Sequence, residues 1–129
     1  MQCPVCQTPM IAIELDEVET DYCPECQGIW LDAGELEILL EDADQTRRLL
    51  DSFRPAETTE TARLCPICLK SMQKVYVEPS NKAVLIDRCL KSHGLWFDRG
   101  ELMQVLQQGA FDEQGKVAKL LREMYPPEE

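Results

Sequence analysis

The chain has 129 residues, enough for one ordinary domain or two very small ones. Its apolar runs are far too short to span a membrane, and the start, MQCPVC, lacks the charged region and apolar core of a secretory signal. We therefore expect a cytoplasmic protein without membrane contact. The net charge of −11 is uneven: residues 1–61 hold fifteen acids and three bases, whereas residues 62–129 hold nine acids and ten bases. The first half is thus a poor nucleic-acid surface.

Two stretches of the chain repeat one another. Cys-Pro-x-Cys begins at Cys3 and again at Cys65. Further on, DYCPECQGIWLDAGEL from Asp21 aligns without a gap with DRCLKSHGLWFDRGEL from Asp87, and eight of the sixteen positions are identical. The pattern indicates one unit that has been duplicated, rather than a long array of repeats.

A β-hairpin is predicted between the two cysteine groups of each copy. In the first copy, residues 11–15 and 18–22 alternate in polarity around the turn Asp16-Glu17. The second copy repeats this alternation at residues 75–77 and 84–86 around a longer turn, which contains Pro79.

A helix is predicted after each hairpin. Asp32 stands three residues before Glu35, and Asp98 three before Glu101, a spacing that lets the first residue cap the helix and the second reach back to it. We expect the first helix to run to about residue 53 and the second to about residue 108. A third helix, over residues 109–125, would carry Val117, Leu120, Leu121 and Met124 on one face.

The cysteines and the single histidine divide into two sets of four. His93 lies four residues after Cys89, next to the position where the second copy has Ser92 in place of the cysteine of the first copy. Because an imidazole reaches further than a thiol, it can serve from one residue later. The predicted sets are Cys3, Cys6, Cys23 and Cys26 in the first copy, and Cys65, Cys68, Cys89 and His93 in the second.

Four soft ligands around one ion suit tetrahedral Zn²⁺, so we predict two structural zinc ions per chain. Seven cysteines in a reducing compartment favour metal ligands over disulfides. A thiol–disulfide redox role for the Cys-x-x-Cys pairs is disfavoured, because such motifs open a helix in a βαβ setting that is missing here. Iron stays an alternative for the all-cysteine set. Four protein ligands leave no position for water or substrate, so we expect no enzymatic activity.

Other repeated residues have structural interpretations. Trp30 and Trp96 are expected to pack beside the zinc sites rather than act as exposed anchors or stacking platforms. The two glycines at equivalent positions, Gly28 and Gly94, are expected to hold a backbone conformation that other residues resist. The acids near the helix starts, Asp32, Glu35, Asp98 and Glu101, are read as helix caps rather than as catalytic carboxylates.

The predicted fold is small α+β, with two tandem zinc-ribbon units (β-hairpin plus zinc knuckles), each followed by an α-helix, and a further C-terminal helix. The predicted boundaries are residues 1–53 for ribbon one with a long helix, 54–63 for the linker, 64–108 for ribbon two with its helix, 109–125 for the C-terminal helix, and 126–129 for the tail.

These motifs resemble the bacterial and archaeal TFIIB-type zinc-finger (transcription factor zinc-finger) proteins. That family's pattern is Cys-Pro-x-Cys, a hairpin, Cys-x-x-Cys-x-Gly-x-Trp, one more apolar residue, Asp and Gly-Glu-Leu. Residues 3–36 match it throughout, and residues 65–102 match except at Ser92 and His93. The resemblance implies a zinc ribbon, and the family name suggests a link to transcription.

Three functions are compatible with the sequence. The first is a non-enzymatic protein-interaction module whose helices and acidic first half bind a protein partner. The second is a nucleic-acid-binding ribbon acting through residues 65–99, which hold six bases against three acids. The third is a metal- or redox-responsive protein, in which oxidation of the thiolates ejects zinc. The bases of the second alternative are Lys70, Lys74, Lys82, Arg88, Lys91 and Arg99.

Overall fold

A computed structural model describes residues 1–15, 18–32, 34–40, 43–51, 53–56, 63–77, 84–102 and 104–105. Two helices and seven strands are defined in it. They are β1 (Ile11–Leu15), β2 (Val18–Tyr22), β3 (Ile29–Asp32), α1 (Glu35–Leu40), α2 (Ala43–Asp51), β4 (Arg54–Pro55), β5 (Gln73–Val77), β6 (Val84–Arg88) and β7 (Gly94–Phe97).

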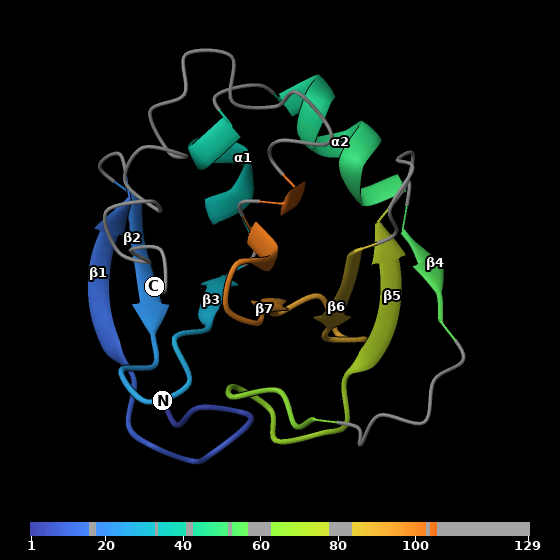
Figure 1. The fold of residues 1–129 in the computed structure, drawn as a ribbon. Coiled ribbons are helices and arrows are strands. Elements are labelled where there is room, and N and C mark those ends of the chain that lie inside the picture. The colour runs from blue at the N-terminus through green and yellow to red at the C-terminus, as the bar shows by residue number, and fades with distance from the viewer. Residues whose placement is uncertain are drawn as a thin grey trace, which may run out of the picture.

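The strands form one antiparallel sheet in the order β1-β2-β3-β7-β6-β5-β4 (Figure 1). Both predicted hairpins are confirmed: β1 pairs with β2, and β5 pairs with β6. A third strand follows each hairpin, β3 in the first unit and β7 in the second. The sequence prediction did not contain these two strands, and they are the elements that join the units.

The seam between the units is the pairing of β3 with β7. The register pairs, in order, Ile29 with Phe97, Trp30 with Trp96, Leu31 with Leu95 and Asp32 with Gly94. From Asp21 on, equivalent residues of the copies differ by 66 in number, so Trp30 corresponds to Trp96. Exchanging the copies maps the Trp30–Trp96 pair onto itself and interchanges the two pairs beside it, Ile29–Phe97 and Leu31–Leu95. The two units are therefore related by a local two-fold axis between the tryptophans, and they share one sheet instead of swinging apart on a linker.

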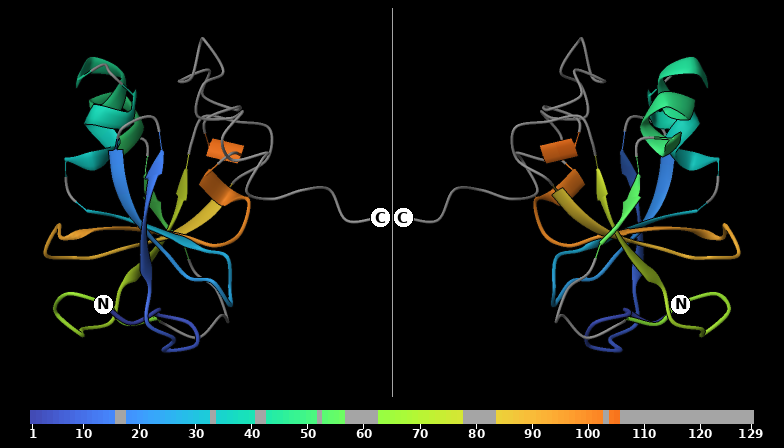
Figure 2. Two further views of the ribbon diagram at one scale, coloured as in Figure 1. Left: turned by 90° about the vertical axis from the view of Figure 1, so that its left-hand side faces the viewer. Right: turned by 90° about the vertical axis from the view of Figure 1, so that its right-hand side faces the viewer.

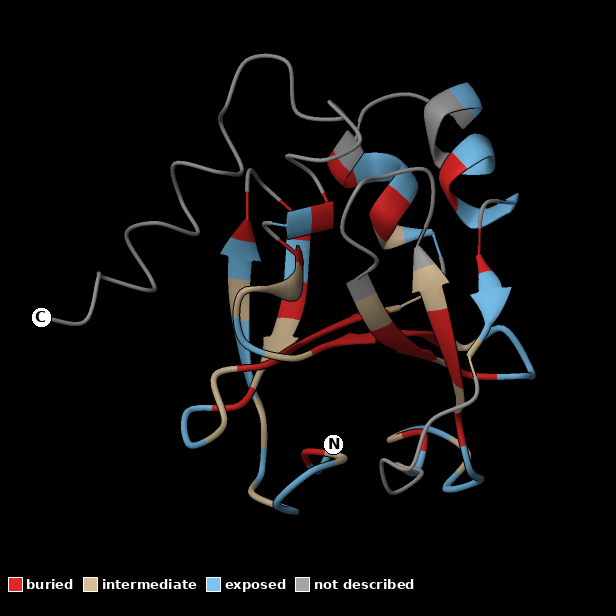
Figure 3. Ribbon diagram, turned by 45° about the vertical axis from the view of Figure 1, so that its right-hand side comes forward, coloured by how far each residue is buried: buried red, intermediate tan, exposed pale blue. Residues whose placement is uncertain are grey.

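Both faces of the central strands are covered (Figure 3), because successive side chains of a strand point to opposite faces. On one face, Ile29, Leu31 and Phe97 join an aliphatic cluster that includes leucines of the two helices. On the other, Trp30 and Trp96 are fully buried in a second cluster with cysteines from both copies. In Figure 1 the helices accordingly lie above the central strands and the cysteine-bearing loops below.

Gly28 and Gly94 serve this seam in a way that differs from the prediction. The glycines with positive φ are Gly34 and Gly100, so backbone conformation does not explain the other two. A Cβ on Gly28 would lie 2.3 Å from the Trp96 ring, and one on Gly94 would lie 2.7 Å from the Trp30 ring. Each unit therefore uses a glycine to make room for the tryptophan of the other.

The single helix predicted to reach residue 53 is two helices in the structure, α1 and α2. Leu36 of α1 and Leu49 of α2 both belong to the aliphatic cluster. Along one straight helix these residues would be about 20 Å apart, too far for both to reach a core this small. Among the described side chains of the two helices, Leu36, Leu39 and Leu49 are buried in this cluster, whereas Ile38 and Leu50 are exposed.

The predicted bounds of the linker and of the second helix agree only partly with the observed elements. The first two residues of the predicted linker form the edge strand β4, which pairs with β5. After β7, residues 101–102 and 104–105 are helical, at the start of the helix predicted to end near residue 108. The predicted helix at 109–125 and tail at 126–129 lie outside the described residues.

Candidate metal centres

The cysteine pairs lie on tight turns, or knuckles, whose backbone points amide groups at sulfur. The amide of Val5 donates to Cys3 Sγ at 3.3 Å, and that of Cys26 donates to Cys23 Sγ at 3.2 Å. Ile67 repeats the first contact in the second copy, at 3.4 Å from Cys65 Sγ. Hydrogen bonds of this kind favour the ionised thiolate, which is the form that binds metal.

Two clusters of four potential ligands result, and all eight predicted residues lie in them. Within each cluster the ligand atoms are within 4.8 Å of one another. All seven cysteines are free, with no disulfide. The clusters are Cys3, Cys6, Cys23 and Cys26 in the first unit, and Cys65, Cys68, Cys89 and His93 in the second.

The spacing of the ligand atoms fits zinc. Zn–S bonds of about 2.3 Å in a tetrahedron place the sulfurs about 3.8 Å apart. In the first cluster, the Cys3–Cys26 and Cys6–Cys23 sulfur pairs are 3.8 and 3.6 Å apart. In the second, the corresponding Cys68–Cys89 distance is 3.8 Å. The two clusters therefore fit two structural zinc ions, one in each unit.

His93 reaches its cluster because its knuckle turns one residue early. In the first unit the amide of Gln27 donates to the Cys23 carbonyl, and Gln27 has the positive φ. In the second unit it is the amide of Ser92 that donates to the Cys89 carbonyl, and Ser92 has the positive φ. His93 Nδ1 then lies 3.4 Å from Cys89 Sγ and 3.8 Å from Cys65 Sγ. The prediction named only the reach of the imidazole, and the structure adds a turn that closes one residue earlier than in the first unit.

The ligand thiols differ in pKa, because some are buried and others are exposed. Burial raises the pKa of Cys3, and it raises the pKa of Cys65 to about 11. Cys6 is exposed, and a hydrogen bond with the Thr8 hydroxyl, 3.1 Å away, lowers its pKa to about 6. Since metal binding requires thiolates, loading the buried cysteines must release protons and couples zinc binding to folding.

Behind each cluster, an aspartate holds the buried indole. Trp30 Nε1 donates to Asp32 Oδ1 at 2.6 Å, and Trp96 Nε1 donates to Asp98 Oδ1 at 3.1 Å. The capping prediction is confirmed for the glutamates: Glu35 and Glu101 accept from the amides of Asp32 and Asp98. The aspartate side chains themselves anchor tryptophan, a role that the sequence prediction missed although both residues are identical in the two copies.

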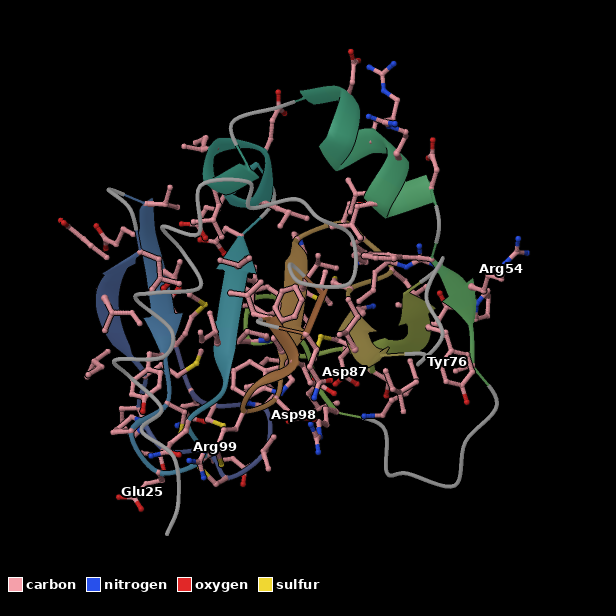
Figure 4. All side chains as sticks on the ribbon, turned by 45° about the horizontal axis from the view of Figure 1, so that its top comes forward. Glu25, Arg54, Tyr76, Asp87, Asp98 and Arg99 are labelled. Atoms are coloured by element: carbon pink, nitrogen blue, oxygen red, sulfur yellow. The ribbon has the colours of Figure 1, made fainter. Side chains whose placement is uncertain are left out.

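The second unit adds a buried charge network. Lys74 Nζ lies 2.8 Å from Asp87 Oδ1, and the two side chains are 7% and 1% exposed. Arg63 forms an ion pair with Asp98 and also lies 3.7 Å from Asp87. Figure 4 shows the two aspartates close together. In the first unit the residue paired with Asp21 is Ala12, so the lysine has no counterpart there. The charge network therefore distinguishes two otherwise similar units.

Two zinc knuckles around each cluster and a β-hairpin between them define the zinc-ribbon class of protein. The transcription factor zinc-finger family model matches residues 2–42 and 64–108, one region in each unit. These regions cover more than half of the chain, which therefore belongs to this family. Searches of curated proteins and of solved structures found no match. Within the described part of the chain, no helix is long and apolar enough to cross a membrane.

Proposed function

We propose that the chain is a non-enzymatic protein-interaction module, in which zinc fixes a small rigid surface that binds a protein partner in transcription or another macromolecular machine. The observation that carries the proposal is that each cluster offers four protein ligands to a tetrahedral ion. A zinc ion held by four protein ligands keeps no open position for substrate, so its work is structural.

The distribution of basic residues favours a protein partner over nucleic acid. Lys74 is buried against Asp87. Arg88 donates to Gln73 and lies over the ring of Phe53, 5.8 Å from its centroid. Of the six bases counted between residues 65 and 99, Lys82 lies outside the described residues, and Lys70, Lys91 and Arg99 are exposed. Three exposed bases make a weak phosphate-binding surface on a chain of net charge −11.

The test compares the two partner classes with one zinc-loaded preparation of the full chain. Cross-linking in cells would identify bound proteins, and each candidate would be purified and titrated by calorimetry against zinc-loaded and zinc-stripped chain. In parallel, fluorescence anisotropy would follow mixed single- and double-stranded DNA and RNA over a salt series. We expect zinc-dependent binding of a purified protein and no nucleic-acid binding at physiological salt. Salt-sensitive nucleic-acid binding without any protein partner would overturn the proposal.

A further inference from the structure

Exposed aliphatic side chains gather on the knuckles of the second unit. We call these four residues the knuckle patch; their exposed fractions are 48% for Leu64, 46% for Ile67, 68% for Leu69 and 67% for Leu90. The equivalent residues in the first unit are Gln2, Val5, Gln7 and Pro24. Both units need knuckles to hold metal, so the leucines of the second unit are not required by the zinc site itself.

The knuckle patch lies on the two loops that carry the ligands of the second cluster. Ile67 and Leu69 flank the ligand Cys68, and Leu90 follows the ligand Cys89, whose sulfur is 3.8 Å from that of Cys68. Figure 2 shows the two loops that carry these residues on the same side of the molecule, away from the knuckles of the first unit. Exposed aliphatic side chains on turns that a bound zinc ion would fix form a preformed apolar contact surface, because little order is lost when a partner covers them.

The charged side chains on the two knuckles of the second unit are both lysines. Lys70 and Lys91 are exposed next to Leu69 and Leu90, and neither knuckle of the second unit, residues 64–72 and 89–93, contains an acid. In the first unit the equivalent residues are Thr8 and Glu25. The second unit therefore presents aliphatic side chains with a basic rim, and an apolar partner bearing carboxylates is complementary to both.

We propose that the knuckle patch binds a peptide segment of a partner protein that is acidic and rich in apolar side chains. The proposal rests on the interaction function proposed above and locates it on the second unit. Apolar side chains of the peptide cover the leucines, and its carboxylates lie against Lys70 and Lys91. Single-stranded nucleic acid is disfavoured as the occupant, because bases stack on aromatic rings and the patch consists of aliphatic side chains.

The test is a selection of random peptides displayed on phage against the immobilised, zinc-loaded full chain, followed by anisotropy titration of the enriched peptides. We expect enriched sequences with a net negative charge and several apolar residues. The variant Leu69→Gln/Leu90→Gln should weaken their binding tenfold or more. The variant Lys70→Thr/Lys91→Glu, which carries the residues of the first unit, should weaken binding and abolish its salt dependence. Ile38→Gln, on the exposed face of α1, is the matched control and should bind unchanged.

Each variant must retain the zinc content of the parent chain, which separates a lost surface from a lost fold. The proposal is overturned if enriched peptides show no acidic bias, or if both knuckle variants bind them as tightly as the parent. It is also overturned if the patch substitutions abolish self-association of the chain and no peptide binds, since the occupant is then a second copy. If a partner protein identified by cross-linking binds the knuckle variants normally, the patch proposal fails while the interaction function stands.

Discussion

Alanine at Gly94 should disrupt the seam between the two units. A Cβ there would lie 2.3 Å from the Leu31 carbonyl oxygen, whereas real Cβ contacts essentially never fall below 3.0 Å. The obstacle is backbone of the paired strand, so β3 and β7 would have to separate by about 0.7 Å. Overpacking of this kind costs about 3 kcal/mol, which corresponds to a loss of roughly 10 °C in the midpoint of thermal unfolding.

The assay is thermal unfolding of the zinc-loaded chain followed by tryptophan fluorescence. Both tryptophans of the chain lie at the seam, so this signal reports on it directly. Gly34→Ala is the control: Gly34 has a φ of 93° but nothing within 4 Å of its Cβ position, so alanine there should cost only about 1 kcal/mol. A midpoint for Gly94→Ala within two or so degrees of the parent, or a larger loss at Gly34, would refute the seam as described.

Three further predictions concern the second unit. His93→Ala should lower the zinc content from two ions per chain to about one and loosen the second unit, as measured by elemental analysis; an unchanged content would remove His93 from the site. Lys74→Ala leaves the buried Asp87 without its closest partner and should cost about 3 kcal/mol in urea unfolding, whereas Lys70→Ala, at an exposed position, should be neutral. Burial raises the pKa of Glu101 to about 7, so its contribution to stability is greatest below pH 4.5 and is lost as the pH rises through 7. Glu101→Gln should therefore be more stable than the parent at pH 8, and an equal loss of stability with pH in both proteins would contradict this assignment.

The metal clusters and hairpins could be predicted because each leaves a local signal in the sequence. Cysteine spacing identifies a knuckle, and the count of seven cysteines and one histidine assigns His93 to the second set. The alternation of polarity over residues 11–15 and 18–22 identifies a hairpin whose two strands are close in sequence.

The seam left no such signal. Residues 29–32 are a short apolar run between a ligand and a helix start, and periodicity alone does not distinguish a strand from buried helix in a run of this length. The partner strand is more than sixty residues away, so the pairing depends on tertiary packing. Asp32 was interpreted as a cap because its spacing to Glu35 fits one, whereas its hydrogen bond with the nearby indole of Trp30 has no such spacing signal.

Native mass spectrometry of the intact chain, purified under reducing conditions, tests most directly whether metal holds both halves of this sheet. We predict a main species carrying two zinc ions, and unfolding of both units when a strong chelator removes them. A folded chain that carries no metal, or one whose mass reveals cysteines joined in disulfides, would contradict the account.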